Sequence, residues 1–211
     1  PSGNLNKRTL RGSLWLPSQE TIQVCHALLQ SPNFFRLLLR IDEELASQTH
    51  AVACRCGGVL HRANYPRKPR ACLSEVRSDY ESRFSFCCNL CRRRTTSMSV
   101  RFLGRRVYLA LAVVLGSARH AGQTPAATRL SGTLNIPLLT LRRWRHWWQG
   151  EFPQTALWQA ACARFVPPVV SDLFPASLLE RFAGNSEEAL TRFLVFLSPL
   201  TIRPIDLPEG R

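Results

Sequence analysis

Apolar residues recur at helical spacing in the first quarter of the chain. The segments SQETIQVCHALLQ, from Ser18, and SPNFFRLLLRIDEELASQ, from Ser31, each place a hydroxyl residue before an apolar stripe. Pro32 follows Ser31 at a first-turn position, where a missing N–H costs no hydrogen bond. The sequence therefore predicts an N-terminal pair of helices within residues 1–50, after a polar arm over residues 1–16.

Residues 51–103 lack helical periodicity. Gly-Gly at 57–58 and YPRKPR at 65–70 are typical of turns, and RFSFC and SVRFL predict brief strands. Helical spacing returns over residues 104–150, in RRVYLALAVVLGSARHAG, TPAATRLSGTLN and PLLTLRRWRHWWQGEF. Prolines divide residues 151–211 into short predicted helices, among them QTALWQAACARF, PASLLERFAG and SEEALTRFLVFL. The predicted fold class is mainly α with a small β region.

Positive charge is concentrated in the middle of the chain. Lys and Arg number 28 against 14 Asp and Glu, which gives a net charge of +14 and an isoelectric point near 10.6. Most of this excess lies between residues 51 and 150, and such clustering favours a nucleic-acid partner over an acidic protein or a membrane surface. The longest apolar run, VYLALAVVLG, is too short to cross a bilayer, so no membrane partner is expected.

Six of the eight cysteines lie between residues 54 and 91. The first sixteen residues carry charge but no apolar core of a secretory signal, so we expect an intracellular protein, in which clustered cysteines more often hold a metal than form disulfides. Zinc needs four ligands in a tetrahedron, commonly from two short cysteine turns. CCNLCRRR supplies one turn and ACRCGG the other. The predicted ligands of a structural Zn²⁺ ion are Cys54, Cys56, Cys88 and Cys91.

The spacing of these cysteines departs from the usual zinc ribbon. A single residue separates Cys54 from Cys56, and 31 residues lie between the two pairs. A longer hairpin or an inserted basic loop would absorb that distance. Alternative ligands and a different chemistry remain open, because neighbouring thiols beside arginines can also be redox-active. The alternative ligands are Cys87, in place of Cys88, and His61 or Cys72, in place of Cys54.

Arginines accompany the predicted metal site. Three of them follow the second cysteine turn directly, and the proline-containing loop HRANYPRKPR carries more. Guanidinium groups match phosphate oxygens and guanine edges in two-point fashion, and prolines keep a loop extended along a phosphate track. The alternative is a solvated basic loop. The candidate nucleic-acid-binding residues here are Arg62, Arg67, Lys68, Arg70, Arg92, Arg93 and Arg94.

The stretch AATRLSGTLNIPLLTLRRWRHW predicts a helix-turn-helix. Asn135 would take the left-handed turn position, and Pro137 suits the start of the second helix. The inner faces would carry Leu130, Leu134, Ile136, Leu141 and Trp144. The outer face of the second helix would carry Arg142, Arg143 and His146, with Arg145 to one side, as candidates for DNA contacts. An ordinary helical hairpin is the alternative. Trp147 and Trp148 are expected to pack against VYLALAVVL.

The order of zinc ribbon, CRRRTT, long apolar helix and LNIPLLTLRRW resembles the N-terminal DNA-binding part of bacterial insertion-sequence transposases over roughly residues 50–150. In those proteins, a ribbon ending in a Cys-x-x-Cys-Arg-type turn precedes a helix-turn-helix that binds the terminal repeats of the element. The resemblance implies that the four predicted cysteines bind zinc and that Arg142, Arg143 and His146 lie on a recognition helix. It also implies a bacterial, cytoplasmic and nucleoid-associated protein.

The departure from that family concerns catalysis. Such transposases continue into a domain with three carboxylates that hold two metal ions, and the short helical region after residue 150 offers only seven carboxylates and no strand pattern. We therefore expect a zinc-dependent double-stranded DNA-binding accessory or targeting factor that is not an enzyme. Its tail, residues 151–211, would dock a recombinase or another protein. An RNA-binding zinc-ribbon protein and a thiol-based redox sensor are the alternative functions.

Overall fold

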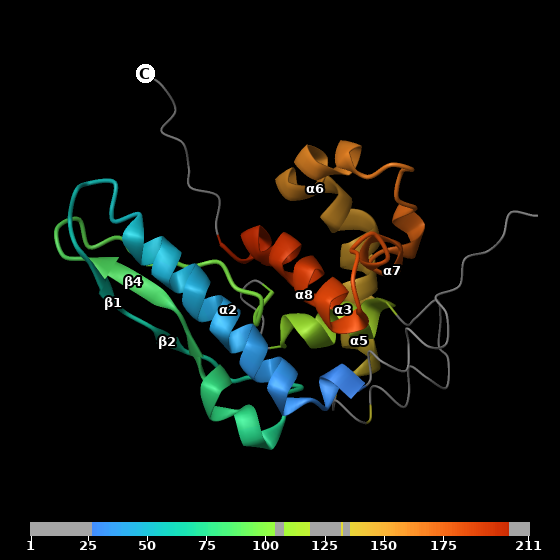
Figure 1. The fold of residues 1–211 in the computed structure, drawn as a ribbon, viewed down its shortest axis with the longest axis horizontal. Helices are drawn as coiled ribbons and strands as arrows, with labels where there is room; N and C mark the ends of the chain where they lie inside the picture. The colour runs from blue at the N-terminus through green and yellow to red at the C-terminus, as the bar shows by residue number, and fades with distance from the viewer. Residues whose placement is uncertain (1–26, 104–107, 119–131, 133–135, 203–211) are drawn as a thin grey trace, which may run out of the picture.

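The computed structural model describes residues 27–103, 108–118, 132 and 136–202 (Figure 1). About half of these residues are helical, and the remainder include a small antiparallel sheet, which confirms the mainly α prediction at this level. The predicted N-terminal arm and nearly all of the first predicted helix lie outside the described residues, as do the turn of the predicted helix-turn-helix and all of its first helix except residue 132. No helix within the described ranges has the length and apolar character needed to cross a membrane.

Helix α2 (Pro32–Ala51) begins where its sequence predicts. The Ser31 side chain caps it by accepting a hydrogen bond from the Phe34 amide at 3.3 Å, and Pro32 occupies the first turn. The helix buries Phe34 and its neighbours in the main hydrophobic core, whereas Ala46, near its other end, packs beneath the sheet. It therefore spans both parts of the molecule, as Figure 1 shows.

The sheet is an interrupted antiparallel hairpin with one added strand. The register places Leu60 opposite Cys88 and Arg62 opposite Phe86. The three-stranded part has the order β1–β4–β5, and β2 pairs with β3. Two 3-10 turns, Ser74–Val76 and Ser78–Tyr80, lie between β2 and β3 and account for much of the long separation between the two cysteine pairs. The strands are β1 (Leu60–Arg62), β2 (Tyr65–Pro66), β3 (Ser82–Arg83), β4 (Ser85–Cys88) and β5 (Arg94–Thr96).

Helices α3 and α5 pack closely against each other. A β-carbon added at Gly116 of α3 would lie 3.2 Å from the Leu141 side chain and 3.3 Å from Trp144, so glycine permits this approach. Trp148 is fully buried in the same core, as expected, while Trp147 is half-buried against it. The helices after α2 are α3 (Ala110–Ala118), α5 (Leu138–His146), α6 (Ala156–Ala161), α7 (Ala176–Leu179) and α8 (Ser186–Leu197).

The C-terminal region shares the core of the helices that precede it. Phe174, Leu178 and Phe193 belong to the same buried cluster as α2 and α3. Helix α8 coincides with the predicted SEEALTRFLVFL and is capped by Asn185, whose side chain accepts from the Glu188 amide at 3.0 Å. Shorter turns connect these helices. They are a π-helical turn at Trp147–Glu151 and 3-10 turns at Phe152–Gln154, Cys162–Arg164, Ser171–Leu173 and Ser198–Thr201.

One predicted strand is wrong. Residues 99–103, SVRFL, are irregular apart from a single bridge between Phe102 and Leu109. The reason is that side chains take the place of a neighbouring strand as hydrogen-bond acceptors: the Ser99 amide donates to the Thr201 hydroxyl at 3.0 Å, and the Val100 amide donates to a buried carboxylate, Asp42 of α2.

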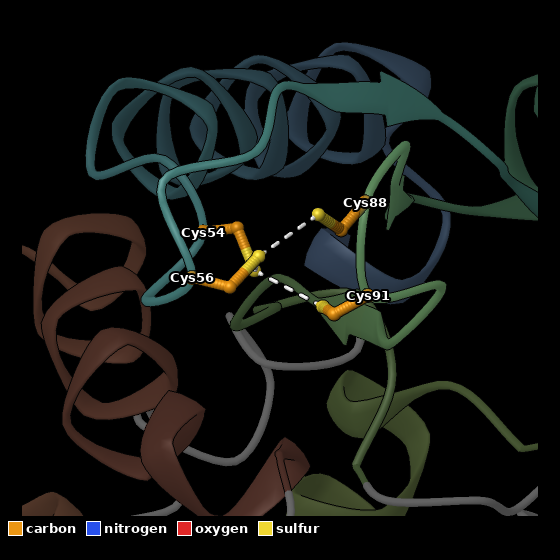
Figure 2. A group of neighbouring side chains, drawn as sticks. All are labelled: Cys54, Cys56, Cys88 and Cys91. Carbon is orange, nitrogen blue, oxygen red and sulfur yellow. Dashed lines mark hydrogen bonds between the residues drawn. The ribbon is translucent and has the colours of Figure 1, made fainter.

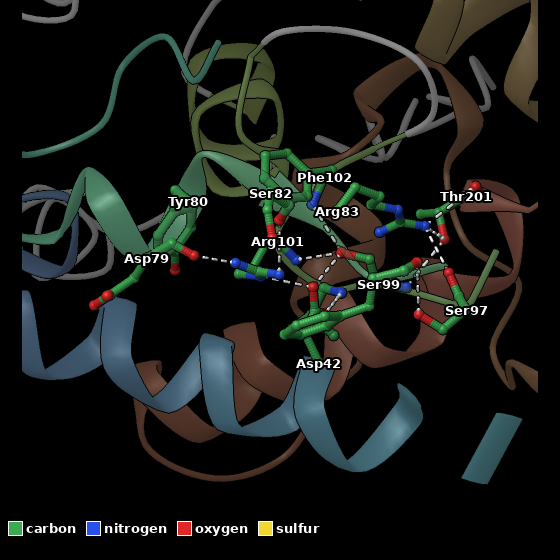
Figure 3. Close-up of polar contacts among 12 residues, drawn as sticks. Asp42, Asp79, Tyr80, Ser82, Arg83, Ser97, Ser99, Arg101, Phe102 and Thr201 are labelled. Atoms are coloured by element: carbon green, nitrogen blue, oxygen red, sulfur yellow. Dashed lines mark hydrogen bonds and ion pairs between the residues drawn. The ribbon is translucent and has the colours of Figure 1, made fainter. Parts of the chain in front are cut away.

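That carboxylate joins the sheet to the helical body (Figure 3). Asp42 accepts hydrogen bonds from the Val100 amide at 2.6 Å and from Arg101 Nε at 2.7 Å. The Arg101 guanidinium also donates to the carbonyl oxygens of Asp79 and Ser82. Because these groups come from α2, the turns before β3 and the segment after β5, the pair fixes all three segments relative to one another.

Candidate metal centre and basic surfaces

The first cysteine loop, residues 53–58, follows α2. Ala53 and Gly57 adopt left-handed backbone conformations, with φ of 59° and 80°, and the Gly57 amide donates to the Cys54 carbonyl at 2.8 Å. At Gly58 a β-carbon would lie 2.5 Å from Cys88 Sγ. The two glycines after Cys56 therefore have different structural roles. Gly57 takes the left-handed conformation that closes the loop, and Gly58 leaves room for the sulfur of Cys88.

The second cysteine loop, residues 88–93, connects β4 to β5. The Arg92 amide donates to the Cys88 carbonyl at 3.2 Å, and Arg92 takes the left-handed conformation that closes the turn, with φ of 57°. Asn89 joins the two loops by two hydrogen bonds with Val59. Its amide donates to the Val59 carbonyl at 3.0 Å, and its side-chain oxygen accepts from the Val59 amide at 2.9 Å.

These loops bring four thiols together at one end of the sheet (Figure 2). The sulfur of Cys54 lies 3.5 Å from that of Cys91, and the sulfur of Cys56 lies 3.5 Å from Cys54 and 3.4 Å from Cys88. All four sulfurs lie within 4.8 Å of one another, so the group can hold a metal ion. This cysteine cluster consists of the four predicted ligands.

The three alternative ligands lie outside the cysteine cluster. Cys87 precedes Cys88 on β4, so its side chain takes the opposite face, where its thiol contacts the Arg92 carbonyl at 3.6 Å. Cys72 packs against the main core, and its burial raises the pKa of its thiol to about 11. His61 is exposed on β1 opposite Cys87.

The cluster rests on a very small core. Ala46, Leu60 and Phe86 are buried together with Cys88 of the cluster itself, and the His50 ring of α2 packs on Phe86 with a centroid separation of 5.2 Å. A core of this size contributes little to folding, so much of the free energy that holds the two cysteine loops together must come from the thiols and whatever they bind.

The thiols of the cluster differ in acidity. The Gly58 backbone N–H, followed by the neighbouring thiols, lowers the pKa of Cys56 to about 6. The Cys56 backbone N–H lowers the pKa of Cys54, but hydrogen bonds with Cys56 and Cys91 outweigh it and raise this pKa to about 12. Deprotonation of Cys56 is therefore favoured, while deprotonation of its neighbour Cys54 is disfavoured. A cation among the sulfurs removes this conflict, because a metal binds thiolates rather than thiols.

Exposed arginines surround the cysteine cluster. Arg92 and Arg93 follow Cys91 as the sequence indicates, and both are exposed. Arg55 stands between Cys54 and Cys56 and is also exposed. Arg55 was not among the residues predicted from the sequence, although its position between two predicted ligands is the signal that could have found it. Each cysteine loop thus presents guanidinium groups to solvent beside the sulfurs.

The basic loop, residues 61–70, contains both exposed side chains and side chains that pack on neighbouring groups. Arg67 is half-buried, with its guanidinium over the rings of Tyr65 and Phe102 at 5.8 and 5.2 Å, and burial lowers its pKa. Arg94 also lies over the Tyr65 ring and donates to the Ala63 carbonyl. Arg70 donates to the Tyr108 hydroxyl at 3.5 Å but remains exposed, as are Arg62 and Lys68.

Helix α5 separates an apolar and a basic face. Ile136, Leu141 and Trp144 are buried, as the helix-turn-helix pattern predicts for the inner face. The predicted outer residues Arg142, Arg143 and His146 are exposed, and Arg145 is half-buried at the edge. Leu138 and Leu139, in the first turn of the helix, are 40% and 58% exposed.

Comparisons with known proteins give no assignment: no protein-family model, no curated protein and no solved structure matches the chain.

Proposed function

We propose that this protein is a zinc-dependent double-stranded DNA-binding protein, a transposase-related accessory or targeting factor without nuclease activity of its own. The observation that carries the proposal is the cysteine cluster, four sulfurs within 4.8 Å of one another in two loops that expose arginines. The basic outer face of α5 provides a second DNA-contacting element.

The donor set supports zinc in a structural role. A tetrahedral Zn²⁺ ion with bonds of about 2.3 Å to sulfur requires the sulfurs to be about 3.8 Å apart. The separations of 3.4 and 3.5 Å within the cluster are close to this value. Four thiolates complete the tetrahedron and leave no open position for a reacting water, which distinguishes a structural site from a catalytic one. The ion would hold the two loops, and therefore their arginines, in fixed positions.

The loop arginines support contacts with a phosphate backbone. Arg55, Arg92 and Arg93 are exposed, and none of them forms an ion pair with another described residue. A fixed guanidinium can bind two phosphate oxygens, so it gains affinity without selecting sequence. Arg67 and Arg94 contribute indirectly, because their packing on Tyr65 stiffens the base of the basic loop.

Helix α5 is suited to the major groove. An α-helix with its side chains is about 10–12 Å across, close to the roughly 12 Å width of that groove. The buried face of α5 holds it against α3, which leaves Arg142, Arg143 and His146 directed outward. A recognition helix of a helix-turn-helix presents such residues to base edges and phosphates.

The region after α5 supports an accessory role. Its helices α6, α7 and α8 pack into the main core, and no strand occurs between residues 147 and 202. Exposed apolar side chains at Val166, Val170 and Leu173 offer contact area for a recombinase or another protein, consistent with the proposed docking role of the tail.

One observation weighs against the RNA-binding alternative. Recognition of single-stranded RNA would use Tyr65 to stack on a base. The Tyr65 ring is half-buried and already packs against the guanidinium groups of Arg67 and Arg94. Its surface is therefore less available for a base than that of a free aromatic side chain.

The test combines metal analysis with binding to duplex DNA. We expect one zinc ion per chain, loss of duplex binding on chelation, and an affinity that falls steeply with salt. Replacing Arg142 and Arg143 together by alanine should weaken binding at least tenfold on a duplex selected from a random library. The matched control is the double variant Arg164→Ala and Arg181→Ala, which removes the same charge from the tail. Equal behaviour of the two double variants, or full binding after chelation, contradicts the proposal.

A further inference from the structure

The outward face of α5 carries an apolar side chain at its centre. Successive residues of an α-helix are about 100° apart around the axis. Leu141 and Trp144 define the buried side. Leu139 and His146 then lie almost directly opposite it, and Arg142 and Arg143 lie on either side of them.

Packing against the part of the chain that the structure describes does not account for Leu139. Its side chain is 58% exposed, whereas Leu141, two residues later, is 4% exposed against α3. A single exposed leucine is common on protein surfaces, but Leu138 and Leu139 are neighbours on a helix that otherwise exposes arginine and histidine. An apolar group set among arginines on an exposed face is suited to a surface that has both an apolar and an anionic part.

The surrounding charge favours duplex DNA over a protein groove as the surface that this face fits. Helix α5 contains three arginines and a histidine but no acidic residue. The C5 methyl group of thymine is the apolar feature of the major groove, and it lies close to guanine acceptors and phosphates that bind arginine. Leu139 also lies in the first turn of α5, the part of a recognition helix that contacts base edges.

We infer that Leu139 reads the methyl group of a thymine in the major groove, with Leu138 at the edge of the same contact. This inference rests on the proposed function and adds a sequence preference to it. The preferred duplex has a thymine beside the base pairs that Arg142 and Arg143 contact. Arg142 and Arg143 lie about 4.5 to 6 Å further along the helix axis than Leu139, which corresponds to one or two base pairs.

The inference is tested by removing the methyl group without changing any hydrogen bond. The probe is a duplex that the zinc-loaded full chain selects from a random library, with each thymine replaced in turn by deoxyuridine. Removing one buried methyl group is expected to weaken binding of the wild-type protein about fourfold at one or two positions. Fluorescence anisotropy at constant salt measures the change.

Two variants assign the effect to Leu139. Leu139→Ala should bind the thymine and deoxyuridine duplexes equally well. Leu173→Ala is the matched control, because Leu173 is 45% exposed but lies in the tail, and it should retain the fourfold difference.

The outcomes separate this inference from the proposed function. A protein that binds no duplex overturns both. A protein that binds a selected duplex but is indifferent to deoxyuridine at every position overturns the inference alone, and the exposed leucines are then a surface for a protein partner. A thymine preference that persists in Leu139→Ala also overturns it, because another group must then contact the methyl.

Discussion

The buried ion pair between Asp42 and Arg101 gives the sharpest prediction about stability. Both side chains are almost completely excluded from water, with exposed fractions of 1% and 0% (Figure 3). Replacing Asp42 by alanine would leave the Arg101 guanidinium buried without a counter-charge and would remove the acceptor of the Val100 amide. The carbonyls that also accept from Arg101 satisfy its hydrogens but do not neutralise its charge.

The expected loss is large for this chain. Breaking a buried ion pair from one side costs about 3–5 kcal/mol, against a total free energy of unfolding of about 5–15 kcal/mol for a typical protein. For about 200 residues, this loss corresponds to a fall in Tm of roughly 6–20 °C. The double variant Asp42→Leu and Arg101→Met replaces the pair by apolar groups and should recover the part of the loss that comes from the unpaired charge, although the Val100 amide still lacks its acceptor.

The assay is urea unfolding in buffer with excess Zn²⁺, followed by far-UV circular dichroism. Glu43→Ala removes an exposed carboxylate from the next position of α2 and should change the free energy of unfolding by less than about 0.5 kcal/mol. If Asp42→Ala costs less than about 1 kcal/mol, the reasoning is refuted. A double variant as unstable as the single one would likewise show that the charge imbalance is not the cause.

Two further predictions concern the cysteines. Gly58→Ala should weaken zinc binding at least tenfold in a chelator competition, because its β-carbon would meet Cys88 Sγ at 2.5 Å and the Asn89 side chain at 2.9 Å. Gly150→Ala, whose β-carbon would meet only His146 Nε2 at an ordinary contact distance of 4.0 Å, should bind zinc like the wild type. The Cys72 thiol, whose pKa is raised to about 11 by burial, should be alkylated about tenfold faster for each unit by which the pH rises between about 7 and 10. Peptide mapping after alkylation measures this rate, and a rate that levels off below about pH 9 would contradict the assigned pKa.

The sequence alone determined the parts of this protein that depend on local patterns. The hydroxyl before Pro32 and the apolar stripe after it predicted α2, and the pattern around Leu190 predicted α8, because caps and helical spacing act over a few residues. The four cysteines of the cluster could also be chosen, since a metal requires a particular number and type of ligand whatever the intervening length.

Only the tertiary structure decided which charged residues are inside. Arg101 and Arg83 lie in a stretch rich in exposed arginines and look like surface residues, yet both are buried. The carboxylate that makes this possible for Arg101 is 59 positions earlier, on α2. A burial that depends on a distant partner leaves no local trace in the sequence, because the desolvation of a charge is offset only when the fold brings the partner to it. A distant partner also explains why SVRFL is not a strand: its backbone amides donate to the side chains of Asp42 and Thr201 rather than to a neighbouring strand.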